Sequence, residues 1–192
     1  MELQRFEHVS YTLVRPLFNL NFQRITRVYA ADGKLAAMVE YPWLRLRTEL
    51  IVYADEGQLV PLFVMRTRRL ATLDREHDLL DPGGARLGCL RTRGIASLFR
   101  DQWDILDDQD RPAGLMIEEG PALIRRFIKL WPGHHRIELG GRTVATIQQR
   151  FHLFRRVFDL TILPVEDPIE PRFAIACALV AMHADLRREQ RE

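Results

Sequence analysis

The sequence predicts a mainly β protein, built as a closed antiparallel barrel of ten or more strands around a hydrophobic C-terminal helix. Three observations lead to this fold. Turn signals recur through most of the chain, short stretches of β-branched or large apolar residues flank them, and a single strong helix pattern comes at the end. We expect one domain over residues 1–192, with the central helix at residues 171–188.

Five turn signals recur along the chain. They are Asp32 to Gly33, Asp55 to Gly57, Asp81 to Gly84, Asp107 to Asp110, and Gly140 to Gly141. Their spacing of about 25 to 30 residues suits a repeating unit of strand, tight turn, strand and connector. Five successive hairpins require ten or more strands.

The segments beside the turns have strand composition. Residues 49–53, 59–65, 114–117 and 143–147 are short and rich in β-branched or large apolar side chains. Pro61 predicts an edge or a bulge, because proline cannot donate to a strand ladder. Residues 43–47 alternate apolar and basic side chains, as a half-buried strand does. Closure into a barrel is favoured because it removes unpaired strand edges.

The chain ends differently. Pro171 suits the first turn of a helix, and residues 173–182 are apolar on every side. This run has ten residues, whereas a membrane-spanning helix needs roughly 17 to 25. A helix that is apolar all round and ends an all-β chain is expected inside the barrel.

Composition narrows the classes of function. The 28 basic residues nearly balance the 26 acidic ones, so the net charge of +2 does not favour nucleic acid as a partner. All but two of the basic residues are arginine, the exceptions being Lys34 and Lys129. Codon usage explains this excess, and recognition of anions by planar guanidinium groups is the alternative.

Catalytic and metal-binding patterns are missing. Ser10 and Ser97 are the only serines and neither lies in a nucleophile elbow. Cys89 and Cys177 lie in apolar segments and are expected to be inert, reduced core thiols. The six histidines have no metal-ligand spacing. We therefore expect no enzyme activity, no cofactor and no metal site.

Clustered basic residues remain as binding candidates. Two of the clusters lie at strand ends, where side chains two residues apart share a face, and one lies in a connecting segment. Such pairs could offer two guanidinium forks to a phosphate; the alternative is a strand face whose arginines are solvated or ion-paired. The candidates for lipid phosphate are Arg66, Arg68, Arg69, Arg91, Arg93, Arg125, Arg126 and Lys129.

Several segments together resemble a known family. They are residues 88–106, the IEEG of residues 117–120, residues 123–127, residues 144–154 and the closing helix pattern. In this order they are similar to the phospholipid scramblase and LURP-one-related proteins, relatives of the Tubby C-terminal domain. The resemblance implies a barrel of about twelve strands around a hydrophobic C-terminal helix. It also implies an association with phospholipids, through phosphoinositide headgroups in Tubby domains and calcium-dependent lipid movement in scramblases.

The resemblance does not carry over the calcium site. The corresponding segment, residues 158–172, has no alternating oxygen ligands around a glycine turn. The function expected from the sequence is therefore non-enzymatic binding of anionic lipid headgroups by a cytoplasmic protein, peripheral at the membrane surface and without a transmembrane span. The alternative is a protein–protein interaction or signalling module with an unknown partner.

Overall fold

Twelve strands and one helix make up the described part of the protein. The computed structural model describes residues 9–17, 24–41, 49–70, 75–92, 102–119 and 132–189, without the side chains of 69–70 and 186–189. The strands are β1 (Ser10–Pro16), β2 (Ile25–Ala30), β3 (Leu35–Glu40), β4 (Glu49–Tyr53), β5 (Pro61–Leu70), β6 (Arg75–Leu80), β7 (Arg86–Thr92), β8 (Gln102–Leu106), β9 (Pro112–Glu119), β10 (His134–Leu139), β11 (Arg142–Arg150) and β12 (Arg155–Ile162).

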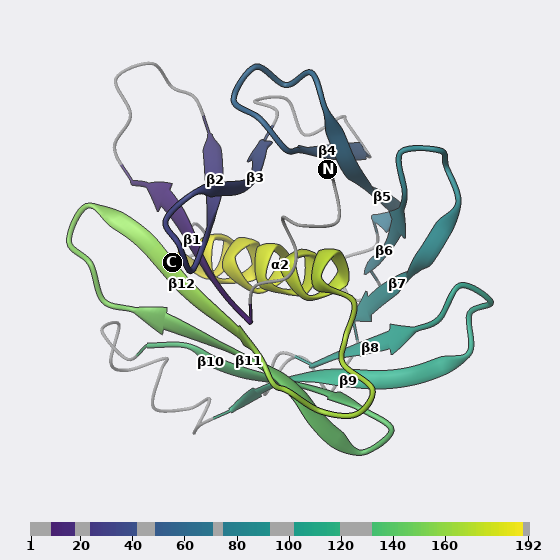
Figure 1. Cartoon of the computed structure of the whole chain (residues 1–192). Coiled ribbons are helices and arrows are strands. Elements are labelled where there is room, and N and C mark those ends of the chain that lie inside the picture. The colour runs from purple at the N-terminus through teal and green to yellow at the C-terminus, as the bar shows by residue number, and fades with distance from the viewer. Residues whose placement is uncertain are drawn as a thin grey trace.

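These strands form the closed antiparallel barrel that the sequence predicted (Figure 1). Each strand pairs with its neighbours in the chain, and β1 closes the barrel by pairing with β12, with Leu13 opposite Phe158. Closure leaves no strand edge free for pairing with another molecule.

The five predicted turns are confirmed as hairpin connections, and all of them lie at one end of the barrel. In an antiparallel meander alternate connections share an end, so residues 31–34, 54–60, 81–85, 107–111 and 140–141 come together. We call this the turn end. The predicted bulge at Pro61 is confirmed, because the register between β4 and β5 shifts where Tyr53 pairs with Pro61. The predicted strand at residues 43–47 lies outside the described residues.

The helix α2 (Pro171–Glu189) passes through the barrel (Figure 1). It begins at the predicted proline and continues to Glu189, one residue past the predicted end. Glu170 caps its start, because the Phe173 amide donates to Glu170 Oε2 at 3.0 Å. Residues 173–182 are all buried, as expected for a helix that is apolar on every side. Within the described part of the chain, no helix is long and apolar enough to cross a membrane.

The first turn of α2 is tightly packed against β7. Gly88 has a φ of +153°, and a Cβ atom there would lie 2.6 Å from both the Leu106 carbonyl oxygen and Phe173 Cε2. Only glycine meets both demands, since an L side chain rarely adopts this backbone conformation and would collide with the Phe173 ring. Glycine at position 88 therefore leaves room for the first turn of α2 inside the barrel wall.

Candidate anion-binding site

The barrel interior changes character along the helix. Around residues 173–182 it is apolar, with Leu13, Phe63 and Phe158 buried in its wall. Towards the C-terminal half of α2, the inward positions at the strand ends carry polar and charged side chains. We call this group the polar layer and this end of the barrel the polar end. Its members are Arg15, Arg24, Tyr41, Arg75, His77, Gln149, Arg156, His183 and Asp185.

Arg15, Tyr41 and His183 form the centre of the polar layer. The rings of Tyr41 and His183 stack with centroids 5.2 Å apart and planes within 4° of parallel. The Arg15 guanidinium carbon lies 4.9 Å from the centroid of the Tyr41 ring, at cation–π distance. No carboxylate among the described residues forms an ion pair with Arg15. Burial lowers the pKa of Arg15, and the positive charge of Arg24 lowers it further.

The ionisation of the neighbouring groups reflects burial beside several cations. Burial lowers the pKa of His183 to about 4, and the charges of Arg15, His77, Arg75 and Arg24 act in the same direction. Burial likewise lowers the pKa of His77 to about 4, assisted by Arg75. Burial also raises the pKa of Tyr41 to about 12. At neutral pH both histidines and the tyrosine are therefore uncharged, and the arginines hold the positive charge.

Two carboxylates offset part of this charge. Asp185 on α2 accepts a hydrogen bond from Gln149 Nε2 at 3.1 Å and lies 3.5 Å from Arg156 Nη1. Glu118 is buried opposite His135, in the last positions where β9 and β10 pair at this end. The described residues at this end thus include four arginines and two carboxylates, of which Glu118 is buried and Asp185 half-buried. Arg15 is an arginine of the layer that forms no ion pair with a described carboxylate.

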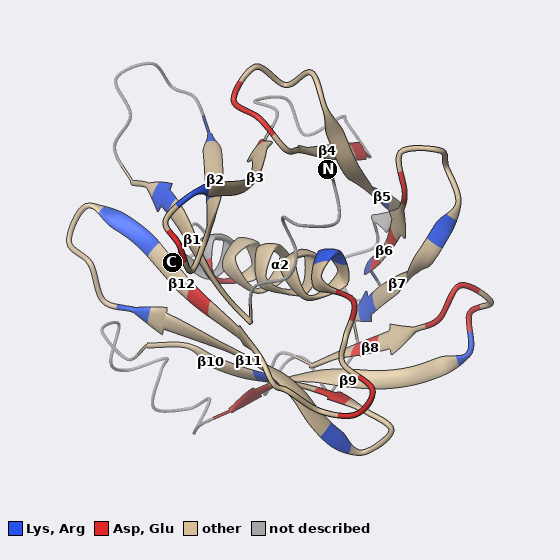
Figure 2. Ribbon diagram, viewed as in Figure 1, with Lys and Arg blue, Asp and Glu red and all other residues tan. Residues whose placement is uncertain are grey.

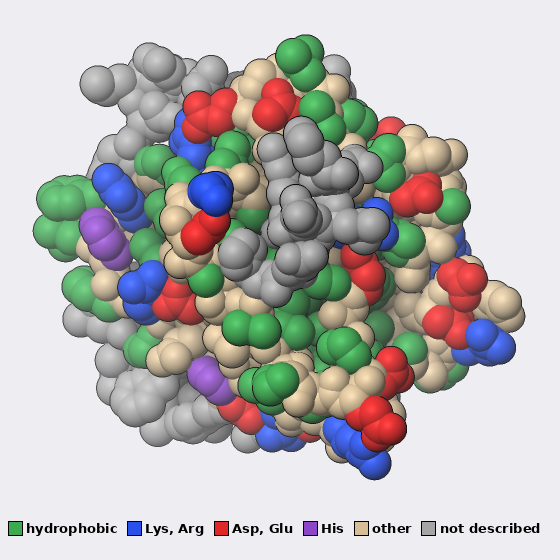
Figure 3. Space-filling model, viewed as in Figure 1, with side chains coloured by type: hydrophobic (Ala, Val, Ile, Leu, Met, Phe, Trp, Pro, Cys, Tyr) green, Lys and Arg blue, Asp and Glu red, His purple; other side chains and the backbone are tan. Residues whose placement is uncertain are grey.

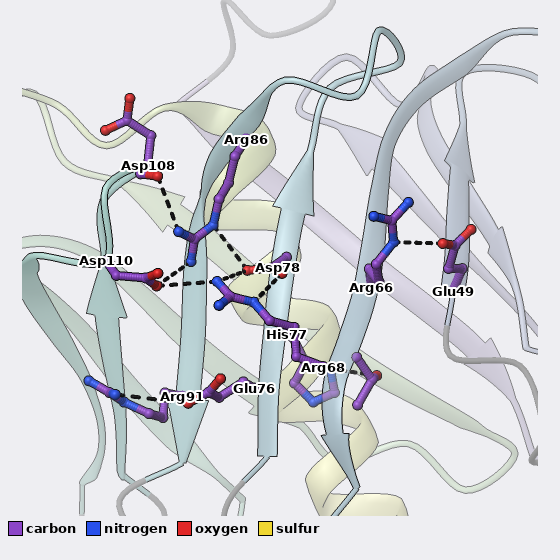
Figure 4. A network of polar contacts seen from close by, with 11 residues as sticks. Glu49, Arg66, Arg68, Glu76, His77, Asp78, Arg86, Arg91, Asp108 and Asp110 are labelled. Atoms are coloured by element: carbon purple, nitrogen blue, oxygen red, sulfur yellow. Dashed lines mark hydrogen bonds and ion pairs between the residues drawn. The ribbon is translucent and has the colours of Figure 1, made fainter.

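Three of the arginines that the sequence singled out lie outside the polar layer. Arg66, Arg68 and Arg91 are each ion-paired, which matches the alternative interpretation of a paired strand face (Figure 4). Arg66 Nε lies 2.6 Å from Glu49 Oε1, and Arg91 Nη1 lies 3.8 Å from Glu76 Oε1. A phosphate at these positions would have to displace a carboxylate.

Arg68 belongs to a larger network on the barrel wall (Figure 4). Its guanidinium binds Asp78, which Arg86 also contacts through Nε at 3.0 Å. Both arginines reach Asp110 in the β8–β9 turn, Arg68 at 3.2 Å and Arg86 at 2.5 Å. The hydrogen bond from Arg86 lowers the pKa of Asp110 to about 2, and Arg68 adds to the effect. These guanidinium groups are already paired with carboxylates. The network therefore joins β5, β6 and β7 to the β8–β9 turn.

The other five predicted candidates lie outside the described side chains. The side chain of Arg69 lies outside the described part of the chain, as do Arg93, Arg125, Arg126 and Lys129. The latter four come from the segments between β7 and β8 and between β9 and β10.

The structure also shows the surroundings of the two cysteines and of the adjacent histidines on β10. Cys89 and Cys177 are free and buried, and burial raises the pKa of both thiols, that of Cys89 to about 11. His134 and His135 point to opposite faces of β10, as adjacent strand residues do: His134 Nδ1 lies 2.6 Å from Glu119, and His135 is buried near Trp103. Among the described residues no cluster of His, Cys, Asp or Glu could hold a metal ion.

Sequence reasoning missed the polar layer. Its members come from six strands or strand ends and one helix, and each contributes only one or two residues at its final positions. A signal was present: Arg15 continues the inward alternation of Tyr11 and Leu13, and His183 follows the apolar run of the helix directly. Polar residues in the inward series of a barrel strand indicate where an apolar interior ends.

Comparisons with known proteins support the fold. No protein-family model matches the chain, and none of the curated proteins matches it. Among solved structures, the chain is similar to a protein from Arabidopsis thaliana determined by X-ray crystallography. The two share 13% sequence identity with a TM-score of 0.52, over 95% of each chain. At this identity the similarity shows the shared fold alone: the mainly β barrel with its single C-terminal helix.

Proposed function

We propose that this protein binds the phosphate-bearing headgroups of anionic phospholipids at a membrane surface and performs no chemistry on them. This is the function implied by the sequence resemblance to scramblase and LURP-one proteins, and membership of that family is part of the proposal. The proposal places the phosphate at the polar layer, beside Arg15.

Arg15 is the observation that carries the proposal. A guanidinium group that is partly buried normally has a carboxylate partner, because burying an unpaired charge is costly. Among the described residues Arg15 has only the face of Tyr41, and a second arginine lies near enough to lower its pKa. A bound phosphate would supply the missing negative charge and accept hydrogen bonds from the planar guanidinium fork.

Vesicle co-sedimentation at low salt tests the proposal. Wild-type protein should sediment with vesicles of phosphatidylcholine and phosphatidylserine, but not with phosphatidylcholine alone. A basic group near an anionic membrane contributes about 1 kcal/mol, so Arg15→Gln should weaken binding about fivefold. Arg66→Gln is the matched control, since Glu49 already neutralises Arg66 on the outer wall; it should bind within about twofold of wild type.

Two results would refute the proposal. One is that wild-type protein does not bind anionic vesicles at low salt. The other is vesicle binding that Arg15→Gln and Arg66→Gln weaken equally, because the polar layer would then have no special part in it. Capture of a protein partner in a manner insensitive to salt, without vesicle binding, would favour the interaction module instead.

A further inference from the structure

The connection between β11 and β12 is largely apolar and has no acidic residue, whereas in the β4–β5 turn the exposed Leu59 and Val60 accompany Asp55 and Glu56. Residues 151–154, Phe-His-Leu-Phe, join the two strands at the polar end. Phe151, Leu153 and Phe154 are 67%, 65% and 60% exposed, although each is a large hydrophobic residue. Figure 3 shows these hydrophobic side chains gathered at the hairpin tip, at the left edge of the view. We call residues 151–154 the apolar tip.

The apolar tip is held in place by the backbone. The Leu17 amide donates to the Phe154 carbonyl at 3.0 Å, which extends the pairing of β1 and β12 to the tip. The Phe154 amide also donates to His152 Nδ1 at 3.3 Å. Three hydrophobic side chains are thus presented to solvent on an ordered hairpin.

Basic residues flank the apolar tip on both sides. Arg150 precedes it and is ion-paired with Asp159, with Nε 2.5 Å from Oδ2. Arg155 follows it, is exposed, and forms no ion pair with any described residue. Arg156 comes next and faces inward, where it meets Asp185. Exposed hydrophobic side chains with a free cation at their base match the bilayer interface, where acyl chains lie just beneath the phosphates.

The surface charge of the two ends is consistent with this orientation. The described turns of the turn end carry seven acidic residues, among them Asp55, Glu56 and Asp81, against two basic ones, Lys34 and Arg111. Figure 2 shows Asp and Glu on these loops with fewer Lys and Arg, and Lys and Arg on β1, β2, β11 and β12 at the opposite side, where β12 also carries an acidic segment. An anionic membrane would repel the turn end and attract the polar end.

We infer that the apolar tip is a membrane anchor: Phe151, Leu153 and Phe154 insert into the interfacial region of an anionic bilayer, and Arg155 binds lipid phosphate beside them. This inference rests on the proposed lipid binding and adds where the bilayer is contacted. The register places Arg15 opposite Arg156, two residues beyond the tip, so insertion would bring headgroups to the polar layer.

A matched pair of variants tests the anchor by vesicle co-sedimentation. The first replaces the tip (Phe151→Ser, Leu153→Ser, Phe154→Ser), and the second replaces exposed hydrophobic residues at the turn end (Leu59→Ser, Val60→Ser). The tip variant should lose affinity for phosphatidylserine-containing vesicles by about 100-fold, since each partly inserted apolar side chain contributes roughly fivefold. The turn-end variant should bind like wild type. Circular dichroism should show both variants folded, because the replaced side chains are exposed.

A fluorescent label gives an independent readout of insertion. Leu153→Cys can be labelled with a polarity-sensitive thiol dye, because Cys89 and Cys177 are buried. Emission should shift to the blue on addition of anionic vesicles, and a lipid-borne quencher should reduce it. The same dye on Leu59→Cys at the turn end should show neither effect.

The possible outcomes separate the anchor from the proposed function. If wild-type protein binds anionic vesicles and the tip variant binds equally well, the anchor is wrong and the lipid proposal stands. If wild-type protein binds no vesicles, both are wrong. If wild-type protein is a dimer and the tip variant a monomer, with unchanged vesicle binding, a second copy covers the tip and the anchor is again overturned.

Discussion

The two ends of this barrel are opposite in character, inside and outside. At the turn end the interior is apolar and closely packed against the start of α2, while the surface turns are acidic. At the polar end the interior carries four arginines and two neutral histidines, while an exposed hairpin is hydrophobic. At the turn end apolar residues are buried and charged residues are exposed, which stabilises a fold. At the polar end charged residues lie in the interior and hydrophobic residues are exposed, an arrangement that is common at binding sites.

The largest expected effect comes from introducing a charge into the apolar half of α2. Ala178 is completely buried, so Ala178→Asp would leave an unpaired carboxylate in the core. The cost of several kcal/mol is comparable with the whole free energy of unfolding of a domain, and we expect an unfolded protein by circular dichroism.

Ala184→Asp applies the same substitution to the polar half. Ala184 is only partly buried, and it lies beside the polar layer. A carboxylate there stays partly hydrated, so this variant should fold and lose far less stability. Equal damage from the two substitutions would contradict the difference between the ends.

Gly88→Ala should give the next largest effect. The added methyl group would meet the Leu106 carbonyl and the Phe173 ring, both at 2.6 Å, so the start of α2 would have to move. We expect a loss of roughly 2 to 4 kcal/mol in the free energy of unfolding, measured with urea.

Gly84→Ala separates crowding from backbone strain. Gly84 has a φ of +88° in the β6–β7 turn, and nothing lies within 4 Å of a Cβ built there. This variant should lose only the roughly 1 to 2 kcal/mol of the left-handed conformation. If Gly84→Ala and Gly88→Ala lose the same free energy of unfolding, close packing of Phe173 against Gly88 does not stabilise the turn end.

The turn end was predictable from sequence because its signals are local. An Asp or Gly in each tight turn, the proline at the β5 bulge and the all-round apolar helix each depend on neighbouring residues. Those signals were sufficient to predict the strand pairing and the threaded helix. Barrel closure followed from a general physical need to remove edges rather than from a motif.

The polar end was not predictable in the same way. Arg15 and His183 are far apart in the chain and meet only because α2 threads the barrel that β1 and β12 close. Basic clusters such as Arg66 and Arg68 stand out in the sequence, yet their carboxylate partners lie on other strands or turns and are invisible to local patterns. The sequence therefore located the basic residues but not the carboxylates that neutralise them.

Acidification should weaken the polar end first. His77 and His183 have pKa values of about 4 in the folded protein, below the value of about 6.5 expected in the unfolded chain. Between pH 6.5 and 4 the unfolded state binds more protons, so stability is complete above that window and is lost as pH falls through it. The slope should approach about 1.4 kcal/mol per pH unit for each histidine.

Urea unfolding at a series of pH values from 7.5 to 4.5 measures this slope. His183→Phe keeps a ring to stack on Tyr41 and should reduce the slope by about half. His152→Gln is the control, because His152 is exposed on the apolar tip and should leave the slope unchanged. A wild-type protein whose stability does not change across this window would show that the histidines are not buried beside the arginines.

The smallest expected effect concerns the acidic surface of the turn end. Asp110→Asn removes the charge that Arg68 and Arg86 share, and asparagine tolerates the φ of 63° at this position, so the backbone of the turn is preserved. Asp110 is exposed, and the Tm should fall slightly, by less in high salt because screening weakens surface ion pairs.

The hydrogen-bonded carboxylate stabilises the fold above pH 3.8, and that contribution disappears as pH falls towards the lowered pKa of about 2, where wild-type protein and Asp110→Asn should become equally stable. Asp108→Asn, in the same turn, is the control, because only the Asp108 carbonyl contacts Arg86. A Tm loss for Asp110→Asn as large as that for Gly88→Ala would mean that the ion-pair network, rather than apolar packing, stabilises the turn end.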